Sequence, residues 1–153
     1  LDLRPEALLL EAARGEEQHV GARADAGQAA VLGQRGDQAE LLRQAADYPP
    51  IKIGLAHRER WIAYVLGETL YLKIFEYDPT AAYPDGGCNF ETFADSEMLE
   101  IESLGPLVTL QPGESTDHHE TWHLFRLTEQ LVIDSEEALA EWIAPFLEKA
   151  GIS

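Results

Sequence analysis

The chain has 153 residues, with 28 Asp and Glu against 11 Lys and Arg, which gives a net charge of −17. This length predicts one domain with a small core, and the acidic surface excludes nucleic acid and anionic lipid as partners because it cannot neutralise phosphates. No apolar run approaches the roughly 20 residues that a membrane-spanning helix needs. The single cysteine, Cys88, excludes an intramolecular disulfide and is interpreted as a small apolar residue, not a nucleophile. We therefore expect a cytoplasmic protein without a cofactor.

The first segment, residues 1–47, contains no aromatic residue and is dominated by Ala, Gly, Gln, Glu, Arg and Leu. Pro5 and Gly15 stand where the two ends of a first helix are expected. Asp37 begins a capping box that predicts a second helix. Between them, residues 21–36 hold few large apolar side chains and are predicted to be loose. This segment is expected to be an atypical helical or loose unit.

Residues 48–153 hold all the aromatic residues, and their hydrophobic period is that of strands. Gly67 and Glu68 predict a two-residue type II′ hairpin turn. Near the end, Asp134 is expected to cap an amphipathic helix that packs on the core and ends at Gly151. The predicted strands are Ile51–Ile53, Trp61–Leu66, Thr69–Tyr77, Cys88–Phe93, Met98–Ser103, Leu107–Leu110 and Ser115–Leu127.

Two carboxylates dominate the polar face of the predicted strand that ends at Ser103. Glu100 and Glu102 point away from the face of Leu99 and Ile101, about 7 Å apart along the strand. At this spacing the carboxylates repel each other, and partial desolvation would raise the pKa of one of them, as a general base requires. The alternative is a solvated outer face.

A second polar pair follows the Gly86-Gly87 turn. Asn89 and Glu91 share one face of a strand by alternation, opposite Cys88. An amide and a carboxylate that project together are suited to hydrogen-bonding sugar hydroxyls. They are equally typical of polar residues on an edge strand.

The motif HETWH, from His119 to His123, matches the HExxH pattern of zinc hydrolases, in which Glu120 would activate water. Glu141 would then supply a third ligand. The mechanism needs both histidines on one helical face, whereas the flanking residues favour a strand, which places the histidines about 13 Å apart. The zinc hydrolase is therefore kept only as a further alternative. The run Asp117-His118-His119 is a weaker candidate for a metal or pH-sensitive site, and such a run is more often the polar end of a strand.

Several motifs between residues 48 and 147 together carry a resemblance to a known family. They are Lys52-Ile53-Gly54, Trp61-Ile62-Ala63-Tyr64, Lys73-Ile74-Phe75 with Tyr77-Asp78-Pro79, Tyr83-Pro84-Asp85-Gly86-Gly87-Cys88-Asn89-Phe90-Glu91, Leu99-Glu100-Ile101-Glu102-Ser103-Leu104-Gly105-Pro106, Leu110-Gln111-Pro112-Gly113-Glu114 and His119-Glu120-Thr121-Trp122. This part of the chain resembles the C-terminal half of the DUF4380 group of the galactose-mutarotase-like superfamily. The resemblance implies a mainly β chain, a partial antiparallel β-supersandwich whose concave sheet face binds carbohydrate.

The resemblance also implies roles for single residues. Glu102 matches the base that acts on the anomeric hydroxyl in aldose 1-epimerases, with Glu100 in reserve and with Asn89 and Glu91 as hydroxyl contacts. The histidines that such epimerases take from the earlier half of the fold have no counterpart in residues 1–47. We therefore expect a carbohydrate-binding domain that is a truncated and inactive member of this superfamily. The alternatives are a remnant that only packs against a partner and a competent epimerase with Glu102 as its base. An open sandwich fragment exposes strand edges, so self-association, or cover by the N-terminal segment, is also expected.

Overall fold

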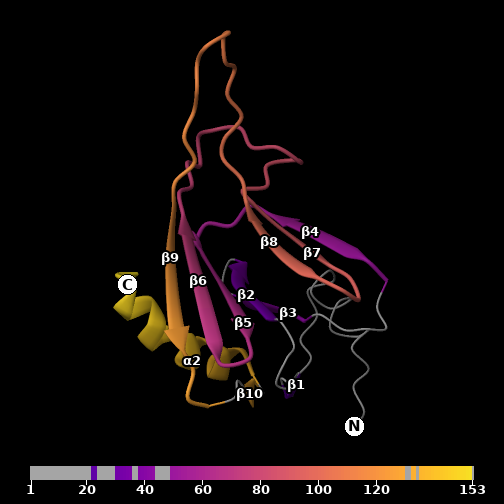
Figure 1. Cartoon of the computed structure of the whole chain (residues 1–153), viewed down its shortest axis with the longest axis vertical. Helices are drawn as coiled ribbons and strands as arrows, with labels where there is room; N and C mark the ends of the chain where they lie inside the picture. Colours follow the sequence, from indigo (N-terminus) through magenta and orange to yellow (C-terminus); the bar gives the residue numbers. More distant parts are fainter. Residues whose placement is uncertain are drawn as a thin grey trace.

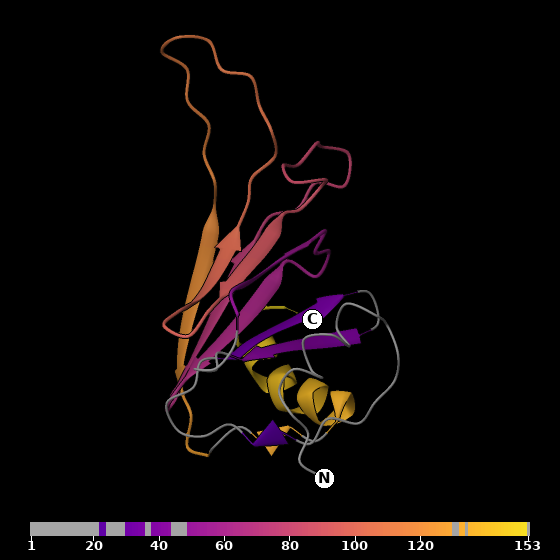
Figure 2. The ribbon, with the colours of Figure 1, turned by 90° about the vertical axis from the view of Figure 1, so that its right-hand side faces the viewer.

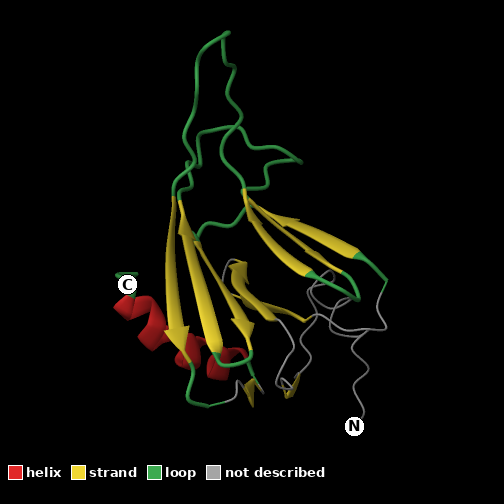
Figure 3. Ribbon diagram, viewed as in Figure 1, coloured by secondary structure: helices red, strands yellow, loops and turns green. Residues whose placement is uncertain are grey.

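The computed structural model of the chain describes residues 22–23, 30–35, 38–43, 49–129, 132–133 and 135–152. The described part is mainly β, as predicted, with one helix near its end (Figure 3). Its elements are β1 (Ala22–Arg23), β2 (Ala30–Arg35), β3 (Gln38–Arg43), β4 (Ile51–Leu55), β5 (Trp61–Leu66), β6 (Thr69–Phe75), β7 (Phe90–Ala94), β8 (Leu99–Ser103), β9 (Glu120–Arg126), β10 (Val132–Ile133) and α2 (Glu136–Lys149).

The strands form two main antiparallel sheets and one short ribbon (Figure 1). The large sheet has five strands in the order β3-β2-β5-β6-β9, and the small sheet has three in the order β4-β7-β8. The ribbon pairs β1 with β10. The small sheet packs on one face of the large sheet and α2 packs on the other, so the predicted antiparallel sandwich is confirmed.

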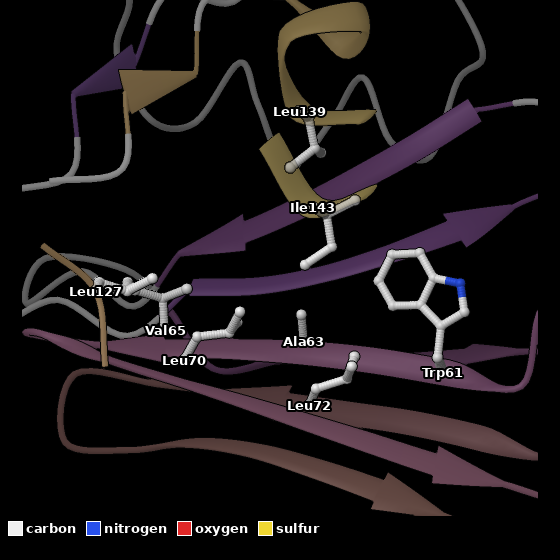
Figure 4. Close-up of a cluster of buried hydrophobic side chains, with 8 residues drawn as sticks. All are labelled: Trp61, Ala63, Val65, Leu70, Leu72, Leu127, Leu139 and Ile143. Carbon is white, nitrogen blue, oxygen red and sulfur yellow. The ribbon is translucent and has the colours of Figure 1, made fainter. Parts of the chain in front are cut away.

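Alternation along β5 explains why the large sheet has apolar side chains on both faces. Trp61, Ala63 and Val65 contact the helix, and Ile62 points the other way, toward the small sheet. The helix-side core is shown in Figure 4 and consists of Trp61, Ala63, Val65, Leu70, Leu72, Leu127, Leu139 and Ile143. The core between the sheets consists of Leu42, Ile62, Phe75, Phe90, Ala94 and Leu99. Both clusters remove large apolar side chains from water, which is the main favourable term in folding.

Helix α2 begins one residue later than predicted. The side chain of Ser135, not of Asp134, caps it by accepting a hydrogen bond from Ala138 N at 3.1 Å, and Asp134 lies outside the described residues. The predicted end at Gly151 is confirmed: this residue has a φ of +79°, and Ile152 N donates to Leu147 O at 2.9 Å. This is the Schellman pattern, which glycine allows because it has no Cβ. Within the described residues, no helix is long and apolar enough to cross a membrane.

Two predictions for the N-terminal segment are wrong where the structure describes it. The stretch after Asp37 forms strand β3 and not a helix, and the supposedly loose residues 21–36 contain β1 and β2. Strand β2 pairs with β5 and β3, and Leu42 is buried between the sheets, so tertiary pairing outweighs the local helix propensity. The first predicted helix, between Pro5 and Gly15, lies outside the described residues.

A long arm, residues 104–119, connects β8 to β9 and projects beyond the sheets (Figures 1 and 2). The strand predicted at Leu107–Leu110 is not formed, and β9 begins only at Glu120. Leu107 is exposed, and its N–H donates to Ala82 O in a neighbouring loop instead of to a strand. Apolar alternation alone does not make a strand where no described partner strand lies alongside. By contrast, the turn predicted at Gly67 is confirmed, with a φ of +56°.

Candidate functional site

The outer face of the small sheet carries the predicted carboxylates. The register pairs Glu91 with Glu102 across β7 and β8, and pairs Gly54 with Glu91 across β4 and β7. Leu99 packs into the core between the sheets, so the neighbouring glutamates along β8 face outward. The predicted orientation of the two glutamates of β8 is therefore confirmed.

A lysine joins two of these carboxylates. Lys52 Nζ lies 2.6 Å from Glu91 Oε2 and 3.3 Å from Glu102 Oε2. The side chain of Glu91 is only 7% exposed, whereas that of Lys52 is 53% exposed and that of Glu102 is 37% exposed. The ammonium group thus offsets the repulsion between Glu91 and Glu102, which lie opposite each other across β7 and β8 and are not the Glu100–Glu102 pair for which repulsion was expected. We call these three residues the outer-face triad.

The contact between Lys52 and Glu91 favours the charged form of both side chains. The hydrogen bond from Lys52 holds the pKa of Glu91 below its ordinary value, against a smaller opposing effect of burial. Its hydrogen bonds to Glu91 and Glu102 in turn raise the pKa of Lys52. At neutral pH Glu91 is therefore a carboxylate and Lys52 an ammonium, so the pair offers acceptors and a donor to a polar ligand.

The neighbouring loop covers one side of Glu91. A Cβ at Gly54 would lie 2.6 Å from Cys88 Sγ and 3.5 Å from Glu91 Oε1, so the thiol and the carboxylate crowd around this glycine. Cys88 Sγ donates to Asp85 O at 3.1 Å. Burial raises the pKa of the thiol, and the charges of Glu91 and Asp85 raise it further. Cys88 is thus a packing residue and not an activated nucleophile.

Asn89 does not share this open surface. It is fully buried, and its amide bonds the backbone of His57: Oδ1 accepts from His57 N at 2.5 Å and Nδ2 donates to His57 O at 2.7 Å. The side chain therefore ties the start of β7 to the segment after β4. The two predicted hydroxyl contacts, Asn89 and Glu91, are accordingly placed in different surroundings.

An aromatic ring lies beside the triad on the outer face. Phe93 stands between Lys52 and Glu100 in the register of β4, β7 and β8, and it is half-buried. Glu100 is exposed at the edge of the same row. The outer face thus presents one apolar ring with charged groups on both sides.

A second polar group of residues, between the two sheets, was not predicted. Ser103 Oγ donates a short hydrogen bond to Glu120 and lies 2.9 Å from His118 Nε2. Lys73 Nζ lies 3.0 Å from Glu120 Oε1 and donates to Ile101 O at 3.2 Å. We call Lys73, Ser103, His118 and Glu120 the inter-sheet cluster, because they join β6, β8 and β9. Lys73 is the sequence feature that could have predicted this cluster, because a lysine inside the apolar run of β6 must find a partner when it is buried.

The inter-sheet cluster contains serine, histidine and glutamate but does not have the geometry of a catalytic triad. Glu120 contacts the serine hydroxyl itself and lies 3.7 Å from the same nitrogen, Nε2, of His118. A triad needs the carboxylate on the other ring nitrogen. Burial pushes the pKa of Glu120 up, but hydrogen bonds from Ser103, Lys73 and Trp122 outweigh it and hold this pKa below its usual value. The hydrogen bonds and the ion pair of the cluster therefore hold the two sheets together.

The HExxH motif does not lie on a helix. Glu120–Arg126 is strand β9, and His119 precedes it in the arm. The helical face that this zinc motif requires is thus contradicted, in agreement with the strand expected from the flanking residues. Among the residues that the structure describes, no group of three or more His, Cys, Asp or Glu side chains is placed to hold a metal ion.

Comparisons with known proteins found no relative of this chain. No family model matches the chain, and no curated protein or solved structure matches it either. The resemblance to the galactose-mutarotase-like superfamily therefore stays a prediction that rests on sequence motifs.

Proposed function

We propose that the outer face of the β4-β7-β8 sheet binds carbohydrate and does not catalyse a reaction on it. The observation that carries this proposal is the shielded Glu91 carboxylate, joined through Lys52 to the more accessible Glu102 on a face not covered by the other sheet. A fixed pair beside an accessible carboxylate is a preorganised set of hydrogen-bonding groups, and such sets orient small polar ligands.

Each group on this face has a counterpart on a sugar. Glu102 accepts hydrogen bonds from hydroxyls, and Lys52 donates to hydroxyl or ring oxygens. Phe93, in the adjacent row, offers apolar surface to the C–H face of a pyranose ring. A sugar is neutral, so the net charge of −17 does not repel it. Asn89 is left out of the site, because its amide is engaged by the backbone of His57.

Binding without catalysis is favoured by the placement of the histidines. His57 is buried in ring contact with Phe75 and Phe90, which belong to the core between the sheets, and His118 contacts the inward-facing Ser103. Neither imidazole is on the face of Glu102. An epimerase needs an acid as well as a base at the substrate, and Lys52 is a poor acid because its carboxylate partners raise its pKa.

Calorimetric titration with D-galactose and with D-glucose tests the proposal. The unaltered chain is expected to bind at least one of them, and Glu102→Gln to weaken binding about tenfold or more, since a charge-assisted hydrogen bond is lost. Glu148→Gln on α2 makes the same charge change at an exposed position and should bind as the unaltered chain does. Absence of binding to both sugars, or equal binding by the two variants, would overturn the proposal.

The epimerase alternative is separated by polarimetry. With freshly dissolved α-D-galactose, the proposal expects the unaltered chain to leave the rate of optical rotation change at its spontaneous value. An acceleration that disappears in Glu102→Gln would establish the epimerase instead. Sugar binding without acceleration supports the binding function proposed here.

A further inference from the structure

Strand β9 is an open edge of the large sheet. It pairs with β6 on one side, and no described strand lies on its other side (Figure 1). Trp122 and Leu124 are 65% and 73% exposed, and both point to the face of the sheet that bears Lys73. A long edge strand with exposed apolar side chains readily pairs with another strand, because its outward N–H and C=O groups can continue the sheet.

The register shows which backbone groups of β9 are free for such pairing. Leu127 N donates to Glu68 O at 2.7 Å, so this position is a hydrogen-bonded pair of the β6–β9 ladder. Hydrogen-bonded pairs alternate along an antiparallel ladder, so Phe125 and His123 also face β6. The N–H and C=O groups of the residues between them, including Leu124, therefore point outward.

We propose that β9 recognises β9 of a second copy of this chain, antiparallel, about a two-fold axis at His123. This register places Trp122 opposite Leu124 of the second copy, and Glu120 opposite Arg126 of the second copy. All four of these positions in β9 have outward backbone groups, so each pair makes two inter-strand hydrogen bonds. The edge is thus complementary to itself in hydrogen bonding, apolar contact and charge.

Alternative registers lose part of this match. A shift by one residue sets outward backbone groups against inward ones, so the ladder cannot form. A shift by two residues in either direction separates Glu120 from Arg126 of the second copy, so the two residues keep their ion pairs with Lys73 and Glu68 within one chain but lose the additional pair between the copies. A foreign partner would have to reproduce the same spacing of apolar and charged residues, which a second copy supplies without any further assumption.

Cross-linking tests the register directly. In a Cys88→Ser background, His123→Cys places two thiols directly opposite each other in a non-hydrogen-bonded pair, with Cα atoms about 4.5 Å apart. This is within the range of about 4.4–6.8 Å that a disulfide spans. Thr121→Cys in the same background is the matched control, because the two-fold axis sets its thiols four residues apart, about 13 Å along the strand.

We expect mild oxidation to give a disulfide-linked dimer with His123→Cys and no disulfide-linked dimer with Thr121→Cys. Equal cross-linking of the two variants, or none with His123→Cys, would overturn the proposed register. Sedimentation equilibrium of the chain without cysteine changes provides the second measurement. Its concentration-dependent dimer should be lost in Trp122→Lys and kept in Leu107→Lys, which alters an equally exposed residue of the arm.

The proposed dimer through β9 and the proposed sugar binding at the outer face can be tested independently of each other. Glu102→Gln lies on the outer face of the small sheet and should leave the dimer unchanged. A dimer that disappears in Leu107→Lys but persists in Trp122→Lys would place the interface on the arm and overturn the proposal for β9.

Discussion

Lys52 Nζ and the Glu91 carboxylate are 2.6 Å apart on the outer face of the small sheet, where the glutamate is shielded and the lysine is half-exposed. The two glutamates of the triad therefore have different roles. Glu91 holds the ammonium group in place, and the more exposed Glu102, at 3.3 Å from Lys52, can exchange part of its contact for a ligand hydroxyl. A sugar is therefore expected to perturb Glu102 more than Glu91.

The first prediction concerns stability and pH in Lys52→Met. Glu91 has a folded-state pKa below its ordinary value, so its stabilisation is present above about pH 4 and is lost as the pH falls through the folded-state pKa. The variant removes the main cause of that lowering. Urea unfolding should show that Lys52→Met is less stable than the unaltered chain at pH 7 and that the difference shrinks toward pH 3. Arg58→Met, at an exposed position, serves as control, and a difference independent of pH would contradict the prediction.

The second prediction concerns the crowding at Gly54. Gly54→Ala places a methyl group 2.6 Å from Cys88 Sγ, so the loop must move away from the sheet, and overpacking of this kind costs about 1–3 kcal/mol. Cys88→Ala in addition should restore most of the lost stability, because it removes the clashing sulfur. Chemical denaturation of the single and double variants measures this. Purely additive losses in the double variant would show that the thiol is not the obstacle.

Local patterns predicted much of the fold. Alternation along β8 placed Glu100 and Glu102 on one face, and apolar spacing along α2 identified the side that packs on the sheet. Gly67 and Gly151 marked a turn and a helix end correctly, since both positions have positive φ. These features depend on residues close in the sequence, where the physical rules are strongest.

Features that depend on distant partners could not be predicted. Lys52 is 50 positions from Glu102, and no local rule indicates that they meet. The pairing of β2 with β5 overrides the helical preference after Asp37, and the arm stays irregular because its apolar residues lack a described partner strand. Asn89 had the sequence signature of a ligand contact, but burial assigns it to the backbone of His57.

The third prediction is that Asn89→Ala destabilises the chain. The change removes the two buried hydrogen bonds that the Asn89 amide makes with His57 N and His57 O, each worth about 1 kcal/mol. Thermal and urea unfolding measure the loss, and amide hydrogen exchange at His57 should accelerate. Asn89→Asp keeps the acceptor but not the donor, so it should retain protection of the His57 amide better than Asn89→Ala does. Unchanged stability in Asn89→Ala would refute this role.

The fourth prediction concerns the inter-sheet cluster. Lys73→Met leaves the Glu120 carboxylate without its ammonium partner and removes the contact with Ile101 O, so it should cost about 1–3 kcal/mol of unfolding free energy. Glu120→Gln in the same chain removes the unpaired charge, and the double variant should lose less than the sum of the single losses. Denaturation of all three variants checks this coupling. Strict additivity would indicate that the two side chains act independently.

An amide-resolved NMR titration with D-galactose tests most directly whether the outer face of the small sheet binds sugar. Sugar binding at this face should give concentration-dependent shifts in β4, β7 and β8 that are largest near Lys52, Phe93 and Glu102. The shifts should leave β9 unaffected and should be lost in Glu102→Gln. Shifts confined to other strands, or shifts that persist unchanged in Glu102→Gln, would contradict sugar binding at this face.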